Sequence, residues 1–177
     1  MQRRLFFALP AQSLASKLHH CQQRLRTEHH KKPVNADNFH LTLHFLGLQD
    51  ERLLPRLCQA AEQVHVAPFD ILLDQYGLFR HARCLWLGPQ QSPRPLRELV
   101  RQLGEQLKTL DLQVSDDYRP HITLFRNAHG MTQLTAPVLK LAVSEFILYE
   151  SVSTNDGVLY KPLHRWLLQE QSGEQKP

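Results

Sequence analysis

The sequence has few of the features that mark disulfide-rich or membrane-spanning proteins. Its 177 residues include three cysteines without a CxxC pair, which excludes a disulfide framework and indicates free thiols in a reducing compartment. No run approaches the roughly 20 apolar residues that a membrane span needs. The hydrophobic content of 42% and charged content of 21% are those of an ordinary globular protein. We therefore expect a cytoplasmic protein with no membrane partner.

The length fits one compact domain, which we expect to be monomeric. The formal net charge of +4 is compatible with a polyanionic partner but is too common to identify one. The polar segment 169–177 is expected to be a disordered tail, so the predicted domain covers residues 1–168.

Hydrophobic periodicity predicts strands and helices in two similar halves. The expected elements of the first half are strands at 5–9, 39–46 and 69–73 and helices at 12–27 and 50–64. Those of the second half are strands at 84–87, from 121, at 139–149 and at 158–168, and a helix at 95–110. The offsets repeat, since Leu5 precedes His40 by 35 positions (40 − 5 = 35) and Leu85 precedes His121 by 36 (121 − 85 = 36). We predict an α+β fold of two duplicated lobes, whose antiparallel sheets face a central cleft with helices outside.

Two copies of one four-residue pattern stand at matching places in these halves. They are His40-Leu41-Thr42-Leu43 and His121-Ile122-Thr123-Leu124. Because alternate residues of a strand point to the same face, each histidine shares a face with its threonine. Two accidental matches in such a chain are about a 0.3% event, so the pair predicts a site built around both motifs.

Phosphodiester cleavage needs a base, an acid and donors to the phosphate oxygens. Two imidazoles supply acid and base near neutral pH without a metal, and two threonine hydroxyls supply donors. Arg126 adds a planar cation suited to phosphate. Strand alternation also puts His44 on the face of His40 as a candidate substrate contact. A metal pair at His40 and His44 would need helical spacing, so no metal ligand is expected.

The tandem motifs resemble those of the two-histidine (2H) phosphoesterases, which lie about eighty residues apart; here the separation is 81 (121 − 40 = 81). The closest resemblance is to the RNA 2′,3′-cyclic phosphodiesterases, also called 2′-5′ RNA ligases. It implies hydrolysis of RNA 2′,3′-cyclic phosphate ends to 2′-phosphate ends, with reversible 2′-5′ ligation as a side activity. No cofactor is implied, and tRNA fragments are among the candidate substrates.

The resemblance also implies roles for single residues. His40 would be the general acid at the ribose O3′ leaving atom, and His121 the general base at the attacking water. Thr42, Thr123 and Arg126 would hold phosphate oxygens. From the residues alone, acid and base are not distinguished.

Phe45 would, by the same resemblance, stack on the terminal nucleobase. Strict alternation puts Phe45 on the face opposite His40, so this role requires the strand to end or bulge near His44. Trp86 lies in an apolar strand pattern and is expected in the core.

Three other interpretations stay open at this point. The chain could be a noncatalytic RNA or nucleotide-binding module, a phosphodiesterase acting on a small cyclic phosphate, or a histidine metal-binding protein. Basic residues at 29–32 and 80–83 should matter for an oligonucleotide substrate but not for a small one.

Overall fold

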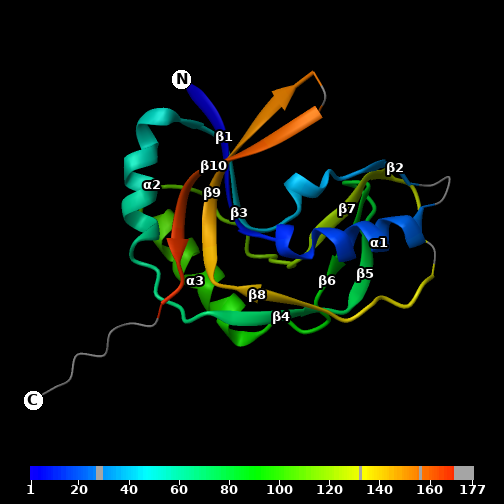
Figure 1. Ribbon diagram of the computed structural model, residues 1–177. Helices are drawn as coiled ribbons and strands as arrows, with labels where there is room; N and C mark the ends of the chain where they lie inside the picture. The colour runs from blue at the N-terminus through cyan, green and yellow to red at the C-terminus, as the bar shows by residue number, and fades with distance from the viewer. Residues whose placement is uncertain (27–29, 132, 156, 170–177) are drawn as a thin grey trace, which may run out of the picture.

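The computed structural model describes residues 1–26, 30–131, 133–155 and 157–169 (Figure 1). Residue 29 of the basic segment and residues 170–177 of the predicted tail lie outside this part. The strands are β1 (Gln2–Pro10), β2 (His30–Pro33), β3 (His40–Asp50), β4 (Phe69–Leu73), β5 (Gln75–Phe79), β6 (Cys84–Gly88), β7 (Ile122–Ala128), β8 (Leu139–Val143), β9 (Glu145–Thr154) and β10 (Gly157–Leu167). The helices are α1 (Ala15–Leu25), α2 (Leu54–Ala61) and α3 (Arg94–Lys108), with 3-10 turns η1 (Gln12–Leu14), η2 (Ala36–Asn38) and η3 (Glu51–Leu53). None of the described helices is long and apolar enough to cross a membrane.

The strands form two antiparallel sheets, which confirms the predicted α+β class. One sheet has eight strands in the order β10-β9-β1-β3-β7-β6-β5, with β2 also paired to β7. The other consists of β4 and β8. In the large sheet, β9 and β10 from the end of the chain lie on the side of β1 and β3, whereas β2 from the first half pairs with β7. The strands of each half of the sequence are therefore distributed over both sides of the sheet. The division into two lobes and the cleft between them stay predictions.

The two motif strands meet at a narrow join. Between β3 and β7 the structure has one bridge pair, Leu41 with Ile122. Beside it, the Tyr118 hydroxyl donates a hydrogen bond of 3.1 Å to the carbonyl of Thr42. A side chain thus satisfies a strand carbonyl at a place where the two strands separate.

Each motif strand packs against the helix from the other half of the chain. Helix α1 packs against β7, where the buried Gln22 amide donates to the carbonyls of Leu124 (2.8 Å) and Val34 (2.9 Å). Helix α3 packs against β3, where Nε2 of the buried His44 donates to the Val100 carbonyl at 2.8 Å. Each half of the chain therefore supplies the helix that packs against the motif strand of the other half.

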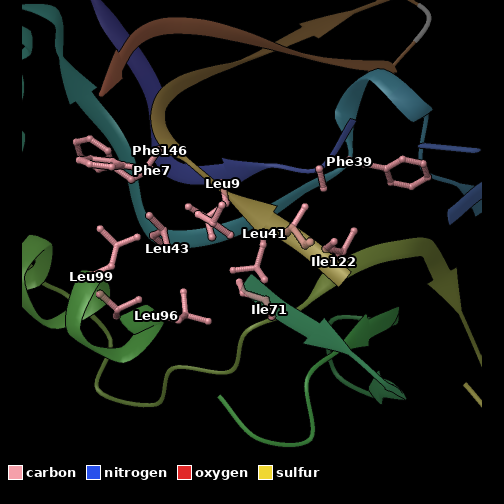
Figure 2. Close-up of a cluster of buried hydrophobic side chains, with 14 of the residues drawn as sticks. Phe7, Leu9, Phe39, Leu41, Leu43, Ile71, Leu96, Leu99, Ile122 and Phe146 are labelled. Atoms are coloured by element: carbon pink, nitrogen blue, oxygen red, sulfur yellow. The ribbon is translucent and has the colours of Figure 1, made fainter. Parts of the chain in front are cut away.

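The hydrophobic residues of the motifs lie in the core between the sheet and the helices. Leu41 and Leu43 of β3 and Ile122 of β7 are buried in the same hydrophobic cluster as leucines of α3, including Leu96 and Leu99 (Figure 2). The alternating pattern then leaves the histidines and threonines of both motifs on the opposite face of the sheet.

Candidate active site

The first motif histidine is held at the start of β3 by backbone and aromatic contacts. His40 Nδ1 lies 2.7 Å from the Asn38 carbonyl, and its Nε2 lies 3.1 Å from Thr42 Oγ1. Its ring contacts Phe6 at 5.1 Å between centroids and meets Tyr160 edge-on at 4.9 Å. Since a carbonyl only accepts, Nδ1 carries a proton, and in neutral His40 the bare Nε2 accepts from the Thr42 hydroxyl.

The second motif histidine has the same type of surroundings. His121 Nδ1 donates to the Arg119 carbonyl at 2.7 Å, so Nε2 of His121 is the nitrogen that can bind a ligand. Its ring meets Phe79 edge-on at 4.8 Å and lies 6.1 Å from Trp86 between centroids. The prediction that Trp86 belongs to the core is wrong, because its half-buried ring contacts His121.

The duplicated spacing contains a signal that could have found Trp86. Phe6 precedes Trp86 by 80 positions (86 − 6 = 80), the same offset as from Leu5 to Leu85 (85 − 5 = 80). Both aromatic residues contact the histidine of their own half. Tyr160 and Phe79, the edge-on partners, carried no comparable signal in the sequence.

The electrostatics link three of the predicted site residues. Burial lowers the pKa of His40 to about 4, with further contributions from the positive charges of Arg126 and His121, while the Asn38 carbonyl acts in the opposite direction. Burial also lowers the pKa of His121, again with a contribution from Arg126. The structure therefore brings both histidines and the arginine into one electrostatic environment, in which both imidazoles are neutral in the free protein at pH 7.

An irregularity in β3 determines which side chains join this group. Along β1, Phe7 pairs with His44 and the next residue pairs with Thr42, so Leu43 is skipped. After this bulge, Phe45 points to the same side as Thr42, and His44 points into the core. The bulge that the stacking role of Phe45 requires is present. The expectation that His44 shares the face of His40 is wrong, because strict alternation stops at the bulge.

A second irregularity occurs at the same position of the second motif. Successive residues of β6 pair with Thr123 and Phe125, so Leu124 is skipped. Arg126 consequently lies on the side of Thr123 and pairs with Cys84, whose Sγ is 3.2 Å from Thr123 Oγ1. The two bulges give Phe45 and Arg126 corresponding places in the two halves.

No metal centre can be assigned from the described residues. They contain no group of three or more histidine, cysteine, aspartate or glutamate side chains that could hold a metal ion. The chemistry available to the arrangement is that of two imidazoles, two hydroxyls and one guanidinium.

Comparisons with known proteins relate most of the chain to one family. The model of the 2′-5′ RNA ligase superfamily matches residues 11–150. The chain is 36% identical to the RNA 2′,3′-cyclic phosphodiesterase of Escherichia coli (strain K12) over 171 residues, which cover 94% of this chain and 97% of that protein. It is 29% identical to the protein of the same name from Archaeoglobus fulgidus over 143 residues, 75% and 81% of the two chains.

Solved structures share the fold over nearly the whole chain. The structure of E. coli LigT complexed with 3′-AMP has a TM-score of 0.88 and 33% identity and covers 96% of this chain and 100% of its own. The structure of TT0787 from Thermus thermophilus has a TM-score of 0.81 and 25% identity, with 95% and 99% of the two chains covered. The chain therefore belongs to the 2′-5′ RNA ligase superfamily of two-histidine phosphoesterases.

Proposed function

We propose that this protein hydrolyses RNA 2′,3′-cyclic phosphate ends to 2′-phosphate ends by acid-base chemistry that needs no metal. The observation that carries the proposal is the pair of imidazoles in the field of one arginine, each with Nδ1 bonded to a carbonyl. Proton exchange with the substrate then falls to Nε2, which in His40 accepts from the Thr42 hydroxyl in the free protein. The relatives from E. coli and A. fulgidus are named RNA 2′,3′-cyclic phosphodiesterases, which supports the same substrate class. We propose further that the protein acts as a cytoplasmic monomer and that tRNA fragments are among its substrates.

In the proposed reaction, Nε2 of His121 takes a proton from water as the water oxygen attacks phosphorus. The bond from phosphorus to O3′ breaks, and His40 donates a proton to O3′, which leaves the phosphate on O2′. The hydroxyls of Thr42 and Thr123 donate to non-bridging oxygens, and Arg126 offsets the negative charge that builds up on them. A 5′-hydroxyl that takes the place of water in the same ring opening gives a 2′-5′ linkage as a side reaction. In the reverse direction, O3′ attacks phosphorus, the 5′-oxygen leaves with a proton, and the cyclic phosphate forms again.

The acid role of His40 requires a proton that the free protein does not keep at neutral pH. An anionic phosphodiester would offset the charge of Arg126, one of the causes that lower the pKa of both imidazoles. The Asn38 carbonyl already favours the charged form of His40. Substrate binding should therefore raise the pKa of His40, so that the imidazole becomes protonated and can act as the acid.

A substrate with sulfur in place of O3′ tests which histidine is the acid, because a thiolate leaves without a proton. Activity on this substrate should return in His40→Ala but not in His121→Ala. The opposite pattern would make His121 the acid and His40 the base.

Phe45 is the proposed stacking surface for the terminal nucleobase. Its side chain is 57% exposed on the histidine face, and the Arg4 guanidinium lies 6.0 Å from its ring centroid. Base stacking is typically worth roughly 1 to 3 kcal/mol, so Phe45→Ala should raise KM about tenfold for substrates with different terminal bases.

The function is tested by incubating the protein with an RNA that ends in a 2′,3′-cyclic phosphate, in excess EDTA, and identifying the terminal phosphate. A 2′-phosphate is expected. His40→Ala and His121→Ala should each lower kcat by a factor on the order of 10² to 10⁴ without loss of the fold, whereas the exposed His19→Ala should retain activity. An unchanged RNA end with retained RNA affinity would indicate a binding module, and turnover of cyclic mononucleotides alone would indicate a small-molecule phosphodiesterase.

A further inference from the structure

Two cations lie side by side next to the proposed phosphate position. Lys32 of β2 is the register partner of Arg126 of β7, so both side chains project from the same side of the sheet. Both are exposed, and neither makes an ion pair with any residue that the structure describes. Figure 1 shows β2 running along the end of β7 that lies away from the join with β3.

Such a pair is unfavourable in the absence of a ligand. Like charges directly opposite each other on neighbouring strands destabilise a sheet, and exposure to water only reduces this repulsion. An anion between the two side chains would convert the repulsion into two charge-assisted hydrogen bonds. The geometry of the pair is therefore that of an anion site that extends the face of Thr123 and Arg126 toward β2.

The positive surface continues beyond this pair. The turn between β5 and β6 carries the exposed Arg80, His81 and Arg83. This turn lies beside the end of β7, because the backbone N–H of Ala128 donates to the Arg83 carbonyl at 2.9 Å. A row of cations that leads away from a single reaction centre fits a chain of phosphates better than one isolated phosphate.

We propose that Lys32, which lies beside Arg126 at the reacting phosphate, forms a subsite for the next RNA phosphate, and that the RNA strand leaves the histidines along β7 toward β2 and the β5–β6 turn. The proposal rests on the proposed function and makes it more specific. It assigns oligonucleotide ends as preferred substrates over cyclic mononucleotides, because a mononucleotide has no second phosphate for Lys32 to bind.

The kinetic test compares an RNA oligonucleotide and a mononucleotide, each ending in a 2′,3′-cyclic phosphate, with Lys32→Gln and wild-type protein. Loss of one hydrogen bond to a charged group should lower the ratio of kcat/KM for oligonucleotide over mononucleotide about tenfold. The slope of log kcat/KM against log salt for the oligonucleotide should decrease by about 0.7, the value for one single-strand phosphate contact. Lys32→Arg should restore both quantities.

The matched control is Lys17→Gln, which removes the same charge from an exposed position of α1. It should leave the substrate ratio and the salt slope at wild-type values. An unchanged ratio in Lys32→Gln, or equal changes in the two variants, would overturn the subsite.

A binding measurement separates failure of the subsite from failure of the proposed function. Fluorescence anisotropy with an RNA oligonucleotide that already ends in a 2′-phosphate requires no turnover. Lys32→Gln should weaken this binding about tenfold, and Lys17→Gln should not. If the wild type turns over neither cyclic substrate but this difference in affinity is found, the function is wrong and the subsite holds. Equal affinities of the three proteins would overturn the subsite even in an active enzyme.

Discussion

The low pKa of His40 should make the folded protein less stable in acid. The imidazole has a pKa of about 4 in the folded protein, against 6.5 as the ordinary value for an unfolded chain. The unfolded chain therefore binds this proton more tightly, so stability is lost as pH falls below 6.5, and the loss levels off below pH 4. Relative to pH 7, linkage gives a loss from this one group of about 2 kcal/mol at pH 5 and about 3 kcal/mol at pH 4.

Urea unfolding of wild type and His40→Gln between pH 7 and pH 4 measures this contribution. All other groups titrate in both proteins, so the free energy of unfolding of the variant should fall by about 3 kcal/mol less over this range. His19→Gln, at an exposed position of α1, should follow the wild type. Parallel curves of unfolding free energy against pH for His40→Gln and wild type would refute the view that burial keeps this imidazole neutral. A histidine NMR titration would then show at which pH His40 takes up its proton.

Three other substitutions test how the site is supported. Gln22→Leu removes one hydrogen bond to the carbonyl of Leu124, the residue at the bulge of β7. The free energy of unfolding measured in urea titrations should fall by about 1 to 3 kcal/mol. Tyr118→Phe removes the hydrogen bond to Thr42 at the join, so steady-state assays should give a kcat at least about tenfold lower, with KM little changed. Gly77→Ala would place a Cβ 2.0 Å from the Trp86 ring and should cost about 1 to 3 kcal/mol, measured by thermal unfolding, whereas an unchanged Tm would mean that the ring moves freely.

The sequence was sufficient to place the four motif side chains, because strand alternation is a local property. His40 with Thr42 and His121 with Thr123 lie on the face away from the core, as their spacing predicts. The error at His44 has a nonlocal cause. The bulge at the preceding residue is defined by pairing with β1, which comes from a distant part of the chain.

The missed parts of the site depend on partners that periodicity does not reveal. Trp86 has apolar neighbours in β6 and reads as a core residue, but its ring lies over Gly77 of β5, where a side chain would collide with it. Strand β5 itself was not predicted, and β2 is a four-residue strand of histidine, lysines and proline that reads as a loop. Both acquire their conformation from pairing, β5 with β6 at one edge of the large sheet and β2 with β7.

The exchange of helices between the halves has a consequence for how such a molecule could arise. A peptide with only the first half would leave the core face of β3 without α3, and a peptide with only the second half would leave that of β7 without α1. In a dimer of a single-motif ancestor, the helix of each subunit could cover the core face of the motif strand in the other subunit. The predicted internal duplication would then correspond to the fusion of a symmetric homodimer whose subunits together formed the proposed catalytic centre.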